Sequence, residues 1–261
     1  MGEDVKPGSC LGATGVTVAI PVYNEEQILF PNTRRLLQYL DSLTVAYQVI
    51  IGSNGSTDAT VRLGEQLQQC YPGVEFFHLS TRGVGLAFQE FVVRAKFPVL
   101  VSLDMDLSAN VRFIENVLAL AGSHDIVVGS KKLAEQRRSI VRKKGSDAFL
   151  WCVRQLTGLP YDDYSIGAKA YSVQFLREFG TSIDDGSSYV LDLCFAARRA
   201  GRSIACVPVS CEDQRTSKFN LLEEALYKFH RLFVLWARSG VSAFSGPPEQ
   251  SSDRSCSPAA R

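Results

Sequence analysis

The stretch FPVLVSLDMDLSA, residues 97–109, decides the fold of this chain. Residues 99–103 form an apolar run that is too short for most helices, and Pro98 bounds it on one side. We therefore predict a buried strand of a parallel sheet. In extended backbone, residues i and i+2 point to the same side. Asp104 and Asp106 should then present their carboxylates together, while Met105 turns back toward the core.

Two carboxylates held close repel each other, and a hard divalent cation offsets that repulsion. Mg²⁺ and Mn²⁺ prefer oxygen ligands and often keep diphosphate oxygens as co-ligands. Open α/β sheets bind ligands beyond the C-terminal ends of their strands, which is where this pair lies. The alternative is that Asp104 and Asp106 cap a following helix or lie in a solvated turn.

Strand-like and helix-like segments alternate through the first half of the chain. We expect strands at 16–22, 48–51, 74–79, 99–103 and 125–128, and helices at 27–43, 59–70, 86–94 and 111–120. The second half is less regular, with helices expected at 146–156, 188–201 and 220–238, a strand-and-turn segment at 162–171 and a strand at 203–208. This alternation predicts an α/β fold with a doubly wound, mostly parallel central sheet flanked by helices.

We expect four segments along the chain. Residues 1–14 are a flexible leader, 15–219 form a single domain, 220–238 form an amphipathic helix, and 239–261, rich in Ser, Pro, Gly and Ala, are a disordered tail. The 261 residues are 46% apolar and suffice for a large core, and the net charge of +1 gives no reason to expect a nucleic-acid partner.

Cysteine usage favours a cytoplasmic protein. The seven Cys residues are odd in number and scattered, which fits reduced thiols rather than disulfides or a zinc site. No run approaches the length of a membrane span.

Three further segments combine strand exits with polar or glycine residues. Residues 21–25 place an acid, Glu25, after the first strand, where it either binds a ligand or caps a helix. The loop 53–58 can read a base or ribose through hydrogen bonds, although Asp58 can equally cap the next helix. Gly83 and Gly85 permit close backbone approach before a helix N-terminus, which suits a phosphate or a nucleotide edge.

A basic run covers residues 131–144 and is opposed by one acid. It is either a solvated face or a grip on phosphate groups. The residues that we single out in it are Lys131, Arg138 and Arg142.

The order of these motifs carries a resemblance. Their succession resembles that of inverting glycosyltransferases of family 2 with the GT-A fold. In chain order, the motifs are VAIPVYNEE, GSNGSTD, RGVGLA and LDMDLS. Within that family the chain is similar to polyprenyl-phosphate glycosyltransferases, the dolichyl-phosphate mannose and glucose synthases, over about residues 16–218.

The resemblance implies roles for individual residues. The nucleotide-sugar is expected to contact Pro21, Tyr23, Glu25, Asn54, Asp58, Gly83, Gly85, Asp104 and Met105. The metal, Mg²⁺ or Mn²⁺, is expected at Asp106 and Ser108, and the catalytic acids are expected to be Asp104, Asp106 and Asp163. Ser53 stands where the family usually has an Asp, which leaves the choice of nucleotide open.

Three later motifs complete the resemblance, each with a departure. The segment 163–169 resembles the family's D-x-T-x-x-F-R, with Lys169 in place of Arg. The segment 191–194 resembles its D-x-E helix, with Cys194 in place of the second acid. The segment 214–218 resembles a shortened R-x-x-x-S-K loop. The phosphate or acceptor contacts then implied are Lys131, Arg138, Arg142, Lys169, Arg215, Ser217 and Lys218.

The implied activity is transfer of a hexose, mannose or glucose, from GDP-mannose or UDP-glucose to a polyprenyl phosphate. A phosphate acceptor is already an oxyanion and needs no general base, whereas a hydroxyl acceptor would need a carboxylate, for which Asp163 and Asp192 are available. The alternatives are therefore a family 2 transferase with a hydroxyl acceptor and a degenerate GT-A domain that binds without turnover.

The helix expected at 220–238 bears on the acceptor. Its apolar residues recur every three or four positions: Leu222, Ala225, Leu226, Phe229, Leu232, Phe233 and Trp236. Such a face either packs on its own domain or lies in a membrane interface. The second alternative predicts a peripheral protein on the cytosolic face of a membrane.

Overall fold

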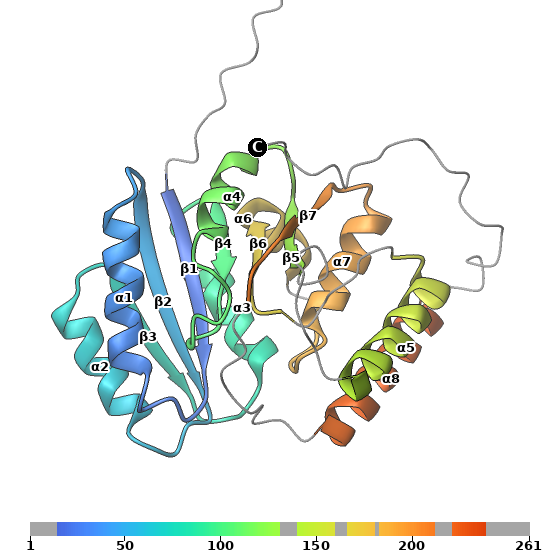
Figure 1. Cartoon of the computed structure of the whole chain (residues 1–261), viewed down its shortest axis with the longest axis horizontal. Helices are drawn as coiled ribbons and strands as arrows, with labels where there is room; N and C mark the ends of the chain where they lie inside the picture. The colour runs from blue at the N-terminus through green and yellow to red at the C-terminus, as the bar shows by residue number, and fades with distance from the viewer. Residues whose placement is uncertain (1–14, 131–139, 160–165, 181–182, 212–220, 239–261) are drawn as a thin grey trace, which may run out of the picture.

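The computed structural model describes residues 15–130, 140–159, 166–180, 183–211 and 221–238. The predicted leader 1–14 and tail 239–261 lie outside these ranges. Seven strands form one sheet in the order β3-β2-β1-β4-β6-β5-β7 (Figure 1). Their bounds are Gly15–Val22 (β1), Ala46–Asn54 (β2), Val74–Leu79 (β3), Val99–Ser102 (β4), Ile126–Ser130 (β5), Lys169–Ser172 (β6) and Ile204–Pro208 (β7).

The sheet is mostly parallel, as the alternation of elements predicts. β1 runs parallel to β2 and β4, β2 to β3, and β5 to β7, whereas β6 is antiparallel to both β4 and β5. Ser102 pairs with Lys169 across the antiparallel step, so β6 begins where β4 ends. The C-terminal ends of β1, β2 and β4 therefore share one edge of the sheet with the start of β6.

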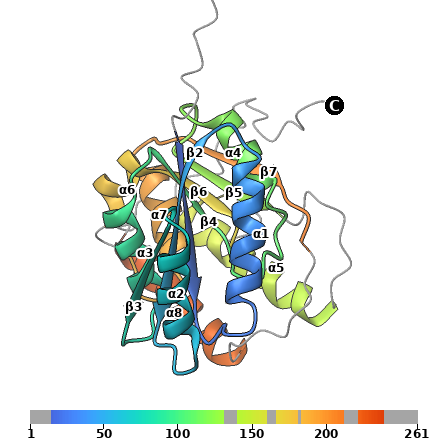
Figure 2. The same ribbon diagram turned by 90° about the vertical axis from the view of Figure 1, so that its left-hand side faces the viewer.

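Eight helices among the described residues surround this sheet. They are Leu29–Asp41 (α1), Thr60–Cys70 (α2), Val84–Arg94 (α3), Phe113–Leu120 (α4), Ile140–Thr157 (α5), Val173–Phe179 (α6), Tyr189–Arg199 (α7) and Leu221–Arg238 (α8). Helices α1, α2 and α4 contribute to the core on one face and α3, α6 and α7 to the core on the other. In the side view, α1 and α4 lie on one side of the strands and α3 and α6 on the other (Figure 2).

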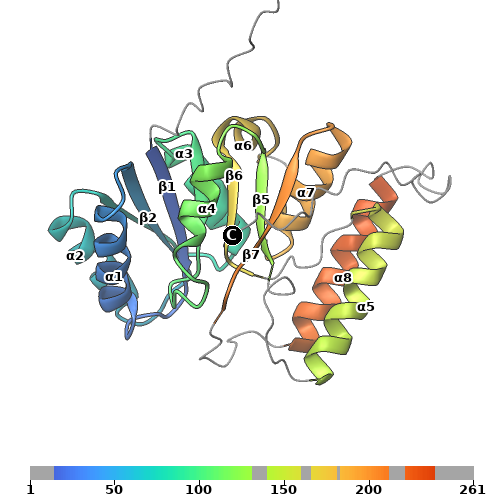
Figure 3. The same ribbon diagram turned by 45° about the horizontal axis from the view of Figure 1, so that its top comes forward.

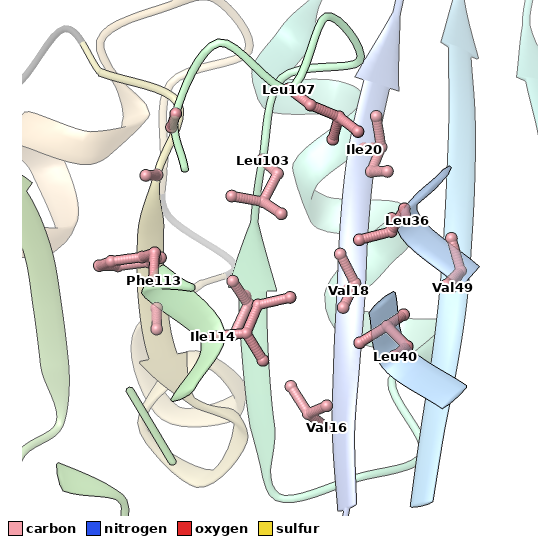
Figure 4. Close-up of a cluster of buried hydrophobic side chains, with 14 of the residues drawn as sticks. Val16, Val18, Ile20, Leu36, Leu40, Val49, Leu103, Leu107, Phe113 and Ile114 are labelled. Carbon is pink, nitrogen blue, oxygen red and sulfur yellow. The ribbon is translucent and has the colours of Figure 1, made fainter. Parts of the chain in front are cut away.

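Alternation along the strands supplies both cores. In β1, Val16, Val18 and Ile20 point into the first core, together with Leu36 and Leu40 of α1 and with Phe113 and Ile114 of α4, whereas Ala19 faces the second core (Figure 4). All of these side chains are buried. The strands have apolar residues on both faces, which is the composition expected of a sheet covered by helices on both sides.

Helices α5 and α8 lie side by side at the edge beyond β7 (Figures 1 and 3). The Phe149 and Phe229 rings join them, with 5.3 Å between centroids at an interplanar angle of 90°. The structure corrects the expectation for α5, which begins at Ile140 and so includes the end of the basic run. It also adds α6, which we did not predict, after the strand-and-turn segment.

Candidate active site at the carboxyl edge of the sheet

The Asp104-Met105-Asp106 segment is a turn rather than a continuation of the strand. β4 ends at Ser102, and the turn closes through a hydrogen bond from Leu107 N to Asp104 O at 3.0 Å. Leu107 takes a positive φ of 50°. The expectation of extended backbone here is therefore wrong, because the chain leaves the sheet two residues before Asp104.

The expected burial of Met105 is nevertheless confirmed. Met105 is buried in the first core, while Asp104 is exposed and Asp106 partly exposed. Asn32 of α1 anchors the turn, because its side-chain amide donates to the Met105 carbonyl at 2.9 Å. A buried methionine and a helix thus present the two carboxylates at the edge of the sheet.

Asp106 has one carboxylate oxygen engaged within the turn. Its Oδ1 accepts a hydrogen bond from Ser108 N at 2.9 Å, and the other oxygen takes none from the part of the chain that the structure describes. Within that part, no group of three or more His, Cys, Asp or Glu residues could hold a metal by itself. A hard divalent cation bound by this carboxylate would need further oxygen ligands, and the oxygens of a diphosphate could supply them.

Asp104 lies against the start of β6. A Cβ atom at Gly167 would come within 2.2 Å of the Asp104 carboxylate, so a larger residue there would displace this carboxylate. The buried Tyr189 of α7 interacts electrostatically with Asp104. Burial raises the pKa of the Tyr189 phenol, its hydrogen bond with Ser102 opposes that rise, and the Asp104 charge adds to it. Sequence reasoning missed both Gly167 and Tyr189 as neighbours of the turn.

The loop after β1 is bonded to the loop after β2. Asn24, with a positive φ of 53°, donates from its backbone N to Ser56 Oγ at 3.1 Å, and its Oδ1 accepts from Thr57 N at 2.8 Å. Glu25 N donates to Thr60 Oγ1 at 2.8 Å. These bonds fix the backbone that carries Tyr23 and Glu25, the residues predicted to face the nucleoside.

Asp58 is engaged within this pair of loops. Its Oδ1 accepts from Thr60 N at 2.9 Å and its Oδ2 from Glu26 N at 3.3 Å, while the Glu26 carboxylate accepts from Ala59 N at 2.9 Å. Burial tends to raise the pKa of Asp58, but hydrogen bonds from Thr60 and Glu26 outweigh it and lower that pKa. Asp58 is thus bonded to the first residue of α2, although the N-cap of that helix is Ala59.

Asn54 is also engaged by the protein. It is buried, and its side-chain amide donates to the Val22 carbonyl at 3.0 Å. Neighbouring Ser53 donates to Ser56 Oγ at 2.9 Å and lies 3.1 Å from His78 Nδ1. The position at which the family usually has an Asp is therefore a buried hydroxyl within a hydrogen-bonded loop.

The Gly83 and Gly85 turn lies beside both loops and against residues 184–185. Arg82 stacks over the Tyr23 ring, with its guanidinium carbon 4.2 Å from the ring centroid. Gly85 N donates to Asp185 O at 2.9 Å, and a Cβ at Gly85 would come within 1.9 Å of Asp184 O. The lack of side chains at these glycines therefore leaves room for the backbone of residues 184–185. The prediction was that it would leave room for a phosphate.

Lys169 is placed at the site edge but is only 3% exposed. Its ammonium donates to the Ile166 carbonyl, and its charge opposes the effect of burial, which raises the pKa of the Cys194 thiol to about 12. The side chains of the other predicted phosphate-binding residues, and Asp163, lie outside the described part of the structure: Lys131, Arg138, Arg142, Arg215, Ser217 and Lys218.

Asp192, which stands in the family's acidic helix, is 7% exposed and pairs with α8. Its Oδ2 accepts from Asp184 N at 2.7 Å and from Arg231 at 3.0 Å. Burial raises the pKa of this carboxyl, and the Arg231 charge opposes that rise. One oxygen of Asp192 is thus engaged within the protein, while Oδ1 is buried and has no hydrogen-bond partner among the described residues.

Comparisons with known proteins show the family and the fold of the chain. Residues 17–163, more than half of the chain, match the model of glycosyl transferase family 2. The chain is 25% identical over 85% of its length to the glycosyltransferase AglD of Haloferax volcanii. It is 29% identical over 60% of its length to undecaprenyl-phosphate 4-deoxy-4-formamido-L-arabinose transferase of Salmonella choleraesuis. It spans 37% and 48% of these two relatives, which is less than two thirds of either.

A solved structure shows the same fold. Glucosyl-3-phosphoglycerate synthase from Mycobacterium tuberculosis, in complex with Mn²⁺ and UDP-glucose, superposes with a TM-score of 0.63 at 18% identity. The match covers 87% of this chain and 79% of that one. The seven-stranded, mostly parallel sheet flanked by helices is therefore that of the GT-A fold.

Proposed function

The chain belongs to glycosyl transferase family 2, and on that premise we propose that it transfers a hexose from a nucleoside-diphosphate sugar to a polyprenyl phosphate. The donor is GDP-mannose or UDP-glucose. One observation carries the proposal: the turn bearing Asp104 and Asp106 lies at the same sheet edge as the bonded loops that hold Tyr23 and Glu25. A relative named for an undecaprenyl-phosphate acceptor supports the acceptor class.

On the donor side, Tyr23 and Glu25 contact the nucleoside and Arg82 fixes the Tyr23 ring by stacking on it. Asn54 and Asp58 act indirectly on nucleoside binding, because their polar atoms hold the loops in place. Asp104 lies nearest the sugar, in the space that Gly167 leaves open.

Asp106 would hold the divalent cation, with Ser108 orienting its carboxylate through the backbone N–H. A bound Mg²⁺ or Mn²⁺ would supply positive charge to the leaving diphosphate. A solved structure of the same fold that contains Mn²⁺ and UDP-glucose supports a divalent metal.

The acceptor is proposed to be a phosphate because its oxyanion attacks without help from a base. Asp192 is paired with Arg231, and Cys194, which replaces the second acid of the family motif, is a fully buried, neutral thiol. A thiol with so high a pKa does not act as a general base near neutral pH, and one oxygen of Asp192 is already held by Arg231. The positive charges proposed to hold the two phosphates come from the basic run and the 214–218 loop.

The outer faces of α5 and α8 are proposed to meet the lipid surface on the cytosolic side of a membrane. Trp151 of α5 is 63% exposed, and Leu226 and Phe233 of α8 are 64% and 58% exposed. Exposed aromatic and aliphatic side chains on amphipathic helices suit a membrane interface. Among the described helices none is long and apolar enough to cross a membrane.

A transfer assay with matched acceptors tests this function. The purified chain is incubated with labelled GDP-mannose or UDP-glucose and either a short polyprenyl phosphate or the corresponding alcohol. We expect organic-extractable label with the phosphate alone, released by mild acid. Label on the alcohol instead would favour a hydroxyl acceptor. Absence of both transfer and donor hydrolysis would favour a degenerate binding domain.

A further inference from the structure

Helix α8 has a polar inner side that reaches two buried acids. Arg231 lies between them: its Nη2 donates to Asp192 Oδ2 at 3.0 Å, and its Nε lies 3.2 Å from Asp184 Oδ1 as an ion pair without hydrogen-bond geometry. Tyr227, one turn earlier, donates from its hydroxyl to Asp184 Oδ2. The side chains of Leu232 and Leu235 are buried on the same helix.

The expectation for this helix is therefore correct in part. Leu226, Phe229 and Phe233 are exposed, but Leu232 is buried and the helix is anchored to its own domain. Packing on its own domain is therefore shown for one side of α8, while contact of the exposed side with a membrane stays a prediction.

Of the two acids that α8 contacts, Asp184 belongs to the loop 183–188 and Asp192 to α7. Besides Tyr227, the Asp184 carboxylate accepts the backbone N–H groups of Gly186 at 3.0 Å and Ser188 at 3.2 Å. A buried carboxylate with this many donors costs free energy if one cationic partner is removed, because the remaining charge is left uncompensated. Arg231 therefore stabilises the conformation of the loop as well as the position of the helix.

The loop in turn holds the first turn of α3. Asp185 O accepts from Gly85 N at 2.9 Å and from Leu86 N at 3.2 Å, which satisfies two of the N–H groups that a helix start leaves without partners. Asp185 Oδ1 also accepts from Gln89 at 3.3 Å. Residues 184–185 are therefore in direct backbone contact with the segment that follows Arg82.

A second contact joins α7 to the same helix. Tyr189 stacks on Phe88 of α3 with 4.5 Å between ring centroids. It also has a hydrogen bond with Ser102 of β4, and the Asp104 charge raises the pKa of its phenol. The chain of contacts thus runs from Arg231 to the loop 183–188, then to α3, and ends at the Arg82–Tyr23 stack and the carboxylate turn.

We infer that Arg231 and Tyr227 are positioning residues for the nucleotide-sugar site, acting through Asp184 and the backbone of Asp185 on the start of α3. This inference rests on the proposed function and extends it, since it makes donor binding depend on the docking of a helix whose other side we propose to meet lipid. Neither residue touches the substrate.

The test compares four variants of the chain. Tyr227→Phe removes one hydrogen bond and keeps the ring, Arg231→Met removes the cation, and His230→Ala changes the exposed neighbour and serves as the matched control. Arg231→Lys tests rescue, since a lysine can restore the charge to one acid only. Two readouts are used: hydrogen exchange of the Gly85 and Leu86 amides, and binding of GDP and UDP with Mn²⁺.

We expect Arg231→Met and Tyr227→Phe to speed exchange of both amides and to weaken nucleotide binding by about threefold to thirtyfold, with Arg231→Lys intermediate and His230→Ala unchanged. If Arg231→Met does not fold, Tyr227→Phe decides. The inference is overturned if the folded variants keep both amides protected and bind nucleotide as the parent does. If the parent binds neither nucleotide, the proposed function fails, while amide exchange still decides whether α8 holds the start of α3.

Discussion

For Gly85→Ala, the structure and the local helix propensity predict changes of opposite sign in the free energy of unfolding. Gly85 lies in the first turn of α3, where alanine would ordinarily favour the helix by up to about 1 kcal/mol. Here the added Cβ would come within 1.9 Å of Asp184 O and 2.7 Å of the Asp185 carbonyl carbon. Both contacts are backbone atoms, so the loop itself must move.

The magnitude follows from what that movement breaks. Overpacking of a closed contact costs about 1–3 kcal/mol, and the bonds from Gly85 N and Leu86 N to Asp185 O contribute about 0.5–1.5 kcal/mol each. After subtraction of the propensity gain, we expect a net loss of about 3 kcal/mol in the free energy of unfolding.

Urea denaturation followed by circular dichroism measures this change, and Gly180→Ala is the control. Gly180 ends α6 with φ at −75°, and the nearest atoms to its added Cβ are 3.9 Å away, so we expect a change within about 0.5 kcal/mol. A Gly85→Ala protein as stable as the parent, or more stable, would refute the argument that the loop 183–188 is closed against α3.

Three further predictions concern the turn, the paired loops and the outer helix face. Asn32→Ala removes the bond to the Met105 carbonyl, so thermal unfolding should show a loss of about 1 kcal/mol; an unchanged melting temperature would contradict its anchoring role. The pKa of Asp58 is lowered on folding, so its stabilisation is present above the ordinary aspartate pKa and is lost as pH falls through the folded value. Asp58→Asn should therefore flatten the acid side of the stability profile measured by urea, and an unaltered profile would count against this. Leu226→Ser with Phe233→Ser should leave stability within about 0.5 kcal/mol but abolish pelleting with anionic liposomes, and retained pelleting would exclude this face as the lipid contact.

Local patterns were sufficient to predict the frame of the sheet. The run 99–103 and the alternation around it predict a buried strand, and the structure has β4 at Val99–Ser102. The Asp pair after it was found because apolar residues end abruptly in polar ones. The turn itself was not predicted, because the local sequence pattern is the same for a strand that continues to Asp106 and for one that ends at Ser102.

Helix α6 was missed although the sequence carries its signal. Ser172 stands before the apolar Val173 and Phe175, and its side chain accepts a hydrogen bond from Phe175 N as an N-cap. Gly180 follows the last turn. A serine cap and a terminal glycine around seven residues were sufficient to predict this short helix.

The role of α8 could not be read from spacing. Its apolar periodicity predicts an amphipathic helix, which is present, but the partners of Arg231 are Asp184 and Asp192, about forty residues earlier in the chain. The same holds for Gly85, whose close neighbour is Asp184 O. Contacts of this kind depend on how the layers assemble, and a local pattern carries no information about them.

The most direct test of the central claim is hexose transfer to a short polyprenyl phosphate by the parent and by Asp106→Asn. The amide keeps the acceptor oxygen for Ser108 N but removes the charge that a divalent cation needs. Asp41→Asn, at the far end of α1, is the matched control. We predict metal-dependent lipid-linked product that falls about a hundredfold or more in Asp106→Asn and is unchanged in Asp41→Asn. Equal product from Asp106→Asn and the parent would contradict the assignment of the carboxylate turn as the centre of the site.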